Sequence, residues 1–376
     1  MQGHAARAIS GAAGDGSRRA FRQVMTSVER AAQRRQKEID MLHSLKQFGS
    51  GARAAVNVVT SALPIAIIGG LLYAGFFVKA EAVINKVEPK AVERRDNFFS
   101  VVAPDAQIAW AAGTGGKIVR SDDGGRTWHR QDSTTLENLQ GIAAWDAQHA
   151  VVAGNHGVVL YTSDGGSTWK HAQVPKSDNP NKLFRVHIFD GVAWAVGEFG
   201  SLLRSDDKGA TWTRAMEEKD RAWNDVFFRG RLGWLVGEFG TVMRSTDGGA
   251  TWSETALDNK VSLMGVDFRD DLNGVAVGLT GTVLVTSDGG QTWREVARPT
   301  REHLLDIAWD EKRWVAVGDK GVMVTSDAAA NEWKAARISE GDVSWRTQIT
   351  RAGDRHYVAG ANLAVLDGGT LTIVGR

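Results

Sequence analysis

Hydrophobic and polar positions divide the chain into three stretches with different patterns. Between residues 17 and 47, apolar side chains recur every three or four positions, which is the spacing of an amphipathic helix. Residues 54–78 carry no charge at all and are bounded by Arg53 and Lys79. After residue 97, short apolar runs alternate with turns that contain Gly or Asp, a pattern typical of short β-strands. The pattern therefore predicts helices before residue 79 and strands after residue 97.

The uncharged stretch is long enough to cross a membrane. As a helix, its 25 residues span roughly 37 Å, against ~30 Å for the hydrocarbon core of a bilayer. The apolar region of a signal peptide is usually ~7–15 residues long and lies nearer the N-terminus. The sequence Ala80-Glu81-Ala82 is a weak cleavage pattern, so a cleaved signal peptide is the alternative. We expect one transmembrane helix over 54–78, in contact with the lipid bilayer.

Charge gives this helix an orientation. The whole chain is nearly neutral, but residues 1–53 hold ten basic and four acidic side chains, a net charge of +6 that leaves −5 for the remainder. Positively charged flanks stay in the cytoplasm. We therefore expect a single pass through the inner (plasma) membrane, with a basic cytoplasmic arm over 1–53, a tether over 79–96, and the C-terminal part in the periplasm.

The role of the amphipathic segment in this arm stays open. Phe21, Met25 and Val28 share one face of the expected helix, and Arg35 interrupts the apolar seam further on. The segment fits a short coiled-coil or partner helix, a basic helix on anionic lipid, or a solvated helix that only precedes the anchor. A signalling anchor whose cytoplasmic helix is the output is a further alternative for the function of the protein.

A repeat dominates the rest of the chain. The motif S/T-x-D-x-G-x-T-W recurs with its tryptophans 41, 43, 40 and 41 residues apart, and a worn copy ends at Trp333. A period of about 40 residues with short strands predicts a β-propeller. Residues 97–376 have room for seven such repeats. Each splits into four apolar runs, as in GIAAW, AVVAG, GVVLYT and TWKHA of the second copy. The expected fold is therefore all-β: a seven-bladed propeller of four-stranded antiparallel blades, preceded by the transmembrane helix and the cytoplasmic amphipathic helix.

The repeated motif has a structural explanation. Its Asp can accept backbone N–H bonds across its own turn, and its second Gly supplies a conformation that a Cβ would forbid. Its Trp can pack between blades and give its indole N–H to a local acceptor. We expect structural roles for Asp123, Trp128, Asp164, Trp169, Asp207, Trp212, Asp247, Trp252, Asp288 and Trp293.

Composition excludes several kinds of site. The chain has no Cys, which removes disulfides, thiolate metal sites and a Cys nucleophile. One or two carboxylates per turn are too few for calcium, which takes ~6–8 oxygen ligands. The histidines have no ligand spacing, and neither a phosphate loop nor a basic stripe follows the arm. We therefore expect no metal, no cofactor and no nucleic acid.

The motif resembles the Asp-box (BNR) repeat, which occurs in sialidases and other glycoside hydrolases. A sialidase resemblance requires a Tyr nucleophile, an arginine cluster and a FRIP motif. FRIP is absent, and the only tyrosines are Tyr73 in the uncharged stretch, Tyr161 in a box strand and Tyr357 in the last repeat. The arginines beside the boxes recur at equivalent positions, which indicates blade periphery: Arg120, Arg204 and Arg244.

A closer resemblance is to the Ycf48/HCF136 type, which comprises photosystem II assembly factors and non-photosynthetic relatives. Their blades follow GxxGxIxxSxDGGxTW, and this chain has GTGGKIVRSDDGGRTW, GEFGSLLRSDDKGATW and GEFGTVMRSTDGGATW, starting at residues 113, 197 and 237. The resemblance implies a compact seven-bladed propeller without catalytic activity that holds a subunit of a membrane complex. The long arm and a helix that is expected to stay uncleaved depart from the photosynthetic members, which reach the membrane surface or lumen by a cleaved signal or a lipid anchor. The resemblance to relatives in non-photosynthetic bacteria implies a polytopic partner, favouring a transporter of the RND/MMPL type, and no small-molecule substrate.

Strand alternation predicts which face meets the partner. The boxes occupy the turns between third and fourth strands, so the turns between second and third strands lie on the opposite face, together with the links between blades. Aromatic residues in two of these turns are expected interface anchors, although each could instead fold back on its own blade. The long link 173–185 and the next link, 216–224, lie beside them. The predicted partner-binding residues are Glu198, Phe199, Glu238, Phe239, Arg185, Arg221 and Trp223.

The sequence thus favours a non-enzymatic accessory or assembly subunit of an inner-membrane complex. The alternative is an extracytoplasmic propeller that binds glycans or hydrolyses them as sialidases do. A deep axial pocket with paired carboxylates would favour the carbohydrate alternative, and a shallow apolar rim would favour the accessory subunit.

Overall fold

The structure is a computed structural model that describes residues 34–39, 41, 63–73, 90–179, 181–258 and 260–375. Residues 34–39 and 63–73 are helical, and they fall within the two helices expected over 17–47 and 54–78. The rest of both expected helices lies outside the described residues. In the described part of the chain, no helix is both long enough and apolar enough to cross a membrane.

Four strands recur in each repeat of the unit that spans Glu88–Arg376. The first strands are β1 (Phe98–Val102), β5 (Leu139–Ala144), β9 (Leu183–Phe189), β13 (Trp223–Arg229), β17 (Leu263–Phe268), β21 (Leu304–Trp309) and β25 (Arg346–Ala352). The second strands are β2 (Ala109–Gly113), β6 (Ala150–Gly154), β10 (Val192–Gly197), β14 (Leu232–Gly237), β18 (Gly274–Gly278), β22 (Trp314–Gly318) and β26 (Arg355–Gly360). The third strands are β3 (Ile118–Ser121), β7 (Val159–Thr162), β11 (Leu202–Ser205), β15 (Val242–Ser245), β19 (Val283–Thr286), β23 (Val322–Ser326) and β27 (Ala364–Asp367). The fourth strands are β4 (His129–Gln131), β8 (Lys170–His171), β12 (Thr213–Arg214), β16 (Ser253–Thr255), β20 (Arg294–Glu295), β24 (Trp333–Arg337) and β28 (Thr370–Ile373).

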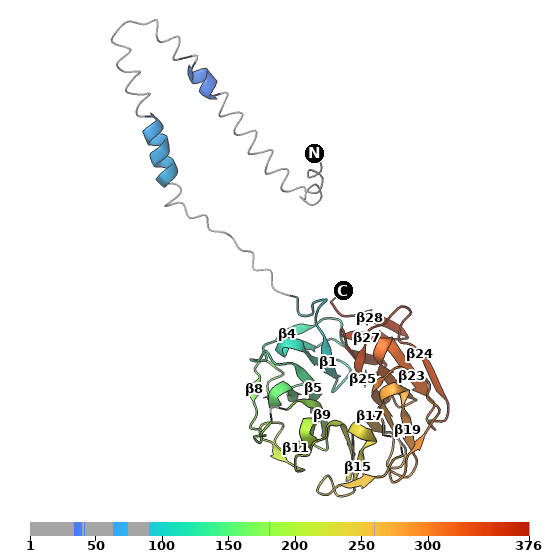
Figure 1. Ribbon diagram of the computed structural model, residues 1–376. Coiled ribbons are helices and arrows are strands. Elements are labelled where there is room, and N and C mark those ends of the chain that lie inside the picture. The colour runs from blue at the N-terminus through green and yellow to red at the C-terminus, as the bar shows by residue number, and fades with distance from the viewer. Residues whose placement is uncertain are drawn as a thin grey trace, which may run out of the picture. The chain divides into compact units, whose positions relative to one another are not determined.

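These strands form antiparallel sheets arranged around a central axis (Figure 1). Five repeats, from the second to the sixth, each form a separate four-stranded sheet in the described chain. The first and last repeats are joined into one eight-stranded sheet through the pair Phe98 and Gly360. Hydrogen bonding therefore gives six sheets where seven were expected. Each first strand contacts the second strand of the preceding repeat, and where the ring closes, β1 also forms a bridge to β26.

Burial explains why the strands read as apolar runs rather than as alternating patterns. The second strand of each repeat lies between two neighbouring blades, and every residue of β6 and β18 is buried. Sheets covered on both faces select continuous apolar sequences. The fourth strands lie at the rim, and both residues of β8 are exposed. Where the sequence predicted TWKHA as a strand, the structure therefore keeps only Lys170–His171.

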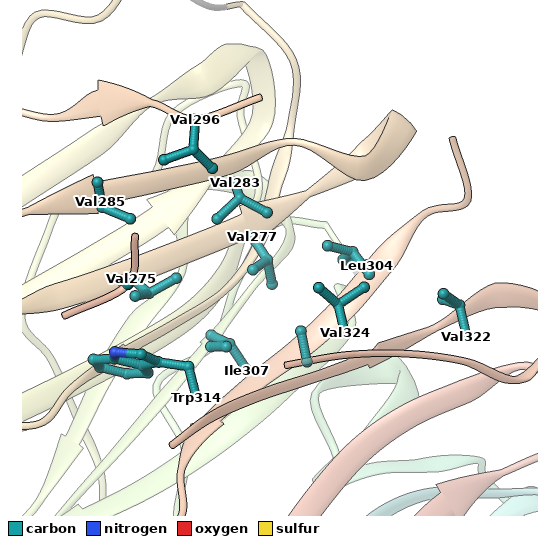
Figure 2. Packing of buried hydrophobic residues seen from close by; sticks show 12 residues of the cluster. Val275, Val277, Val283, Val285, Val296, Leu304, Ile307, Trp314, Val322 and Val324 are labelled. Carbon is teal, nitrogen blue, oxygen red and sulfur yellow. The ribbon is translucent and has the colours of Figure 1, made fainter. Parts of the chain in front are cut away.

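Apolar side chains fill each interface between neighbouring repeats. Figure 2 shows the cluster between the fifth and sixth repeats, where Trp314 and Ile307 lie against Val275. Between the fourth and fifth repeats, the rings of Trp234 and Phe268 stack with their centroids 3.6 Å apart. The same type of cluster joins the last repeat to the first. The described clusters thus follow the ring through all of its interfaces, so each blade is stabilised by both neighbours.

The Asp boxes have the expected geometry. In the first box, the carboxylate of Asp123 accepts the backbone N–H of Thr127 at 2.9 Å and its hydroxyl at 2.6 Å. The N–H of Gly125 donates to Ser121 Oγ at 2.8 Å, and Gly125 has a φ of 84°, in the region that favours glycine. The indole of Trp128 donates to the carbonyl of Gly125 at 3.1 Å. The same Thr-to-Asp bonds recur at Asp164, Asp207, Asp247 and Asp288, so each of these carboxylates bridges its own turn.

The indole bonds differ among the boxes. Trp212 and Trp252 donate to a carbonyl of their own turn, as expected. The indole of Trp169 instead donates to Gln131 Oε1 of the preceding blade, at 3.1 Å, because that side chain reaches across the interface. The buried Nε1 of Trp293 has no hydrogen bond within the described chain. The expectation of a local acceptor is therefore wrong for Trp169 and Trp293.

Replacing Trp234 with Ala should lower the free energy of unfolding by about 3–5 kcal/mol, because Trp234 is fully buried in an interface between blades. Chemical denaturation of the full-length protein measures this change. Phe239→Ala is the matched control, because Phe239 is 66% exposed and its loss should cost less than about 0.5 kcal/mol. Equal losses in the two variants would contradict packing between blades as the main source of stability.

Candidate functional site

Hydrogen bonds divide the propeller into the two expected faces. On one side, which we call the box face, the box residue Gly289 donates its N–H to Leu272, in the turn between first and second strands, at 2.9 Å. On the other side, the turn face, the turns between second and third strands contact the links between blades. The N–H of Gly157 donates to Asn181 at 2.7 Å, and that of Gly200 donates to Arg221 at 2.5 Å. The links and these turns therefore form one continuous surface.

The turns on this face have an unusual backbone. They are one-turn 3-10 helices, and those of the third and fourth repeats are η3 (Glu198–Gly200) and η4 (Glu238–Gly240). Their central residues, Phe199 and Phe239, have φ angles of 54° and 57°, a left-handed conformation that bulky side chains rarely adopt. Phe239 is exposed, whereas Phe199 is half-buried. Of the two aromatic rings, that of Phe239 is therefore the more accessible to a partner.

The two glutamates beside these rings have a structural task. Glu198 Oε2 accepts the backbone N–H of Lys182 at 2.9 Å, and Glu238 Oε2 accepts that of Ala222 at 2.9 Å. Each carboxylate thus ties its turn to the link before its own blade. Glu198 and Glu238 therefore hold the turns that carry the two aromatic residues.

The remaining three predicted residues differ in their exposure. Arg221 lies 5.6 Å from the ring centroid of Trp223 and 3.6 Å from Glu254, at the surface. Trp223 is 1% exposed and belongs to the core between the third and fourth blades. Arg185 is also largely buried, with its side chain 11% exposed. Both buried residues lie on first strands, which run along the propeller axis, so neither belongs to the exposed links and turns of the turn face.

Other apolar residues on the turn face had not been predicted. In the described part of the propeller, four large apolar side chains are more than half exposed: Leu136 at 88%, Val343 at 68%, Phe239 at 66% and Leu272 at 56%. Leu136 and Val343 lie in links, and together with Phe239 they place three of these four on the turn face. The available signal was an apolar residue within a largely polar link, Leu136 in STTLEN and Val343 in EGDVSW.

A cavity of about 220 Å³ lies on the axis, and we call it the axial cavity. Its wall takes one residue from the first strand of each blade, at the position where that strand changes register with its partner. A register shift of this kind is a β-bulge, which re-aims a side chain. The eighth lining residue is Arg185. The seven wall residues are Phe99, Gln140, Phe184, Asn224, Met264, Leu305 and Thr347.

Arg185 belongs to a cluster of charged residues contributed by several blades. Its Nη2 donates to Asp306 Oδ1 at 2.9 Å, and its Nε lies 3.4 Å from Asp225 Oδ1. The carboxylates also accept backbone N–H groups of the next blade, from Val266 to Asp225 at 3.0 Å and from Ile349 to Asp306 at 2.8 Å. The two carboxylates thus provide acceptors for buried backbone N–H groups at the inner edge of the next blade. Buried N–H groups are rarely left without a hydrogen bond.

A third carboxylate, Asp267, makes the cluster acidic. Its Oδ2 accepts the N–H of Trp309 in the next blade at 2.6 Å. Burial raises the pKa values of Asp267 and Asp306 to about 7, although Arg185 partly opposes the rise at Asp306. Burial alone would lower the pKa of Arg185, but the carboxylates of Asp306 and Asp225 raise it. Asp225 and Asp306 therefore share one guanidinium group, and Asp267 adds a third carboxyl group nearby.

Parts of the chain match models of known protein families. The family model described as "Photosynthesis system II assembly factor YCF48" matches residues 133–220, and that of the BNR/Asp-box repeat matches residues 119–130. These matches confirm both resemblances stated from the sequence. No curated protein matches the chain.

Solved structures of several propellers are similar to this chain. A structure of YCF48 bound to a D1 peptide shares 18% identity and a TM-score of 0.60, covering 71% of this chain and 91% of that one. YCF48 from Cyanidioschyzon merolae shares 17% identity and a TM-score of 0.60, covering 74% and 96%. The GH74 xyloglucanase of Xanthomonas campestris shares 16% and a TM-score of 0.59, covering 73% of this chain but 52% of the enzyme. At these identities, the structures show a common fold.

The axial carboxyl groups should make the protein less stable as the pH rises. Asp267 and Asp306 bind protons more tightly in the folded protein than in the unfolded chain, where an Asp titrates near ~3.9. Their contribution is therefore complete below pH ~4 and is lost as the pH rises through about 7. We expect the midpoint of thermal unfolding to fall between pH 5 and pH 8.

Asp306→Asn should reduce this dependence, whereas Asp206→Asn, at an exposed carboxylate, should leave it unchanged. Thermal melts at a series of pH values test both variants. The boxes respond in a different range, because hydrogen bonds from Thr127 lower the pKa of Asp123 to about 2, and those from Thr251 do the same at Asp247. Box stability is lost only below pH ~4. A melting temperature that rises from pH 5 to pH 8 would contradict protonated axial carboxyls.

Proposed function

We propose that this Ycf48-like Asp-box propeller is a non-enzymatic accessory or assembly subunit that docks on a membrane protein through its turn face. The observation that carries the proposal is that three of the four large apolar side chains that are more than half exposed in the described propeller lie on that face. Exposed aromatic side chains are candidate interface anchors, because interface centres are enriched in aromatic residues. On this propeller, Leu136, Phe239 and Val343 occupy the links and turns of one face.

The turn of η4 fixes the backbone of Phe239. Its left-handed conformation recurs at the equivalent positions of the other blades, at Gly115 with a φ of 60° and also at His156, Thr280 and Lys320. The conformation therefore belongs to the repeated turn, and it persists because the surrounding structure holds it. Glu238 supplies that support through its bond to the link. Phe239 is therefore the anchor that we assign to the partner interface, with Phe199 and Arg221 beside it.

The axial residues favour the accessory role over hydrolysis of glycans. Hydrolysis needs two carboxyl groups that face the glycosidic bond from opposite sides. Asp225 and Asp306 are instead committed to Arg185 and to backbone N–H groups. Around the axis, the cavity has a largely apolar wall that includes Phe99, Phe184 and Leu305. These features match the apolar rim expected of a docking protein.

We further propose where this subunit works. The uncharged stretch 54–78 would anchor it in the inner membrane, with the basic arm in the cytoplasm and the propeller in the periplasm. Its partner would be a polytopic protein of that membrane, and a transporter of the RND/MMPL type is our favoured class. A matched YCF48 structure holds a D1 peptide, so recognition of a peptide segment is a known use of this kind of propeller.

Purifying the full-length protein from its native membrane in a gentle detergent tests the proposal. We expect a polytopic membrane protein to be recovered with it in stoichiometric amount, as identified by mass spectrometry. Recovery of the propeller alone, or together with a glycan, would contradict the accessory role and favour the carbohydrate alternative.

Replacing both Phe199 and Phe239 with Ala should reduce partner recovery by about tenfold or more, because truncating buried interface aromatics typically costs ~2 kcal/mol or more. Leu272→Ala is the matched control, because Leu272 is exposed to a similar degree on the box face. Recovery from the control should equal that from the unaltered protein. If the double variant retains the partner, the interface lies elsewhere.

A further inference from the structure

We propose that the axial cavity binds one uncharged apolar side chain, together with a neighbouring backbone carbonyl, from a peptide segment of the partner. The identity of the partner rests on the proposed function, but the site itself is built from residues of this chain. It would form the centre of the turn face, surrounded by the exposed residues described above. A binding interface with a central pocket and outer anchors is a common arrangement in protein complexes.

The size of the cavity selects a small guest. Pockets that hold a cofactor or a drug-sized ligand usually enclose ~300–1,000 Å³, whereas the axial cavity encloses about 220 Å³. This volume suits a single side chain with its adjoining backbone. A sugar chain or a nucleotide would extend well beyond it.

The wall of the cavity selects an apolar guest. Phe99, Phe184, Met264 and Leu305 present carbon and sulfur surface to it. The other three wall residues each use a side-chain donor within the chain. Asn224 Nδ2 donates to the carbonyl of Leu263 at 2.8 Å, Thr347 Oγ1 to that of Phe99 at 2.9 Å, and Gln140 Nε2 to Asn155 Oδ1 at 3.0 Å.

Arg185 supplies the polar contact. Its Nη2 is bonded to Asp306 and its Nε faces Asp225, whereas its Nη1 has no hydrogen bond within the described chain. Because the residue also lines the cavity, this nitrogen can donate to a guest. An oxygen acceptor on the guest, such as a peptide carbonyl, would complete the hydrogen bonds of the guanidinium group.

Charge determines which acceptor fits. Asp225 and Asp306 already pair with the single guanidinium, so its positive charge is matched within the chain. A guest carboxylate would find no unmatched cation in the cavity, and burying an unpaired charge is unfavourable. A cationic guest would first meet Arg185 at the cavity wall. A neutral amide carbonyl avoids both penalties, which points to the interior of a peptide segment and not to a chain end.

The position of the cavity links it to the proposed interface. Its wall residues lie near the start of the first strands, directly after the links that form the turn face. Leu136 and Val343 extend from two of those links, and Phe239 from a turn on the same face. A partner segment that covers these residues therefore passes over the mouth of the cavity, where one of its side chains can insert.

Methyl NMR of the full-length protein, labelled with ¹³C at its methionine methyl groups, tests the site without the partner. The probe is N-acetyl-L-phenylalaninamide, an uncharged apolar side chain with amide carbonyls. Its signal is read at Met264, assigned by comparison with Met264→Leu, while Met243 serves as the internal control. We expect a saturable shift at Met264 with a dissociation constant on the order of 1 mM, as befits a ligand of this size.

N-acetyl-L-phenylalanine, which ends in a carboxylate, should bind at least about tenfold more weakly. Leu305→Trp, which fills the cavity, and Leu305→Glu, which adds a charge to its wall, should each abolish the shift. Phe239→Ala should leave it intact, because Phe239 is not part of the cavity wall. Unchanged probe binding in both Leu305 variants, equal binding of the carboxylate, or no shift at Met264 at concentrations well above millimolar would overturn the inference.

The outcome is distinguishable from that of the proposed function. Normal partner recovery with no probe binding would remove the cavity from the interface and leave the accessory role intact. Probe binding by a protein that recovers no partner would retain the cavity as a peptide-binding site and remove the proposed function.

Discussion

The propeller depends on packing between neighbouring blades. A four-stranded sheet that is apolar on both faces cannot be stable alone in water, so every blade needs a neighbour on each side, and only a closed ring provides one for all of them. Two of these interfaces contain the stack of Trp234 on Phe268 and the contact between Trp128 and Tyr357. The Asp boxes hold the outer turns in shape, but the apolar interfaces hold the ring.

Closing the ring creates a second requirement at its axis. The first strands end their sheets there, and their edge N–H groups need acceptors. Asp225, Asp267 and Asp306 meet this need by reaching into the next blade, and Arg185 partly balances their charge. The raised pKa values of Asp267 and Asp306 follow from this arrangement, because three carboxyl groups cannot all ionise cheaply in a buried site with one cation.

The two faces of the ring differ in which side chains are available to bind a partner. On the box face, the Asp and Thr side chains are used within their own turns. On the turn face, links and turns bond to one another through their backbones, which leaves side chains such as Leu136, Phe239 and Val343 free to meet another molecule. The bulges of the first strands turn one further side chain per blade toward the axial cavity. Both features point to the same face.

The sequence by itself determined the features that repeat locally. Strand positions, the box geometry of Asp123 and its equivalents, and the separation of the two faces follow from residues close together in the chain. Only the tertiary structure decided the fate of Arg185 and Trp223, since a position just after a link lies on the surface or at the axis depending on where the first strand begins. The axial cavity was also invisible, because its wall takes one residue from each of seven repeats, and the bulge that directs each residue inward has no local sequence signature.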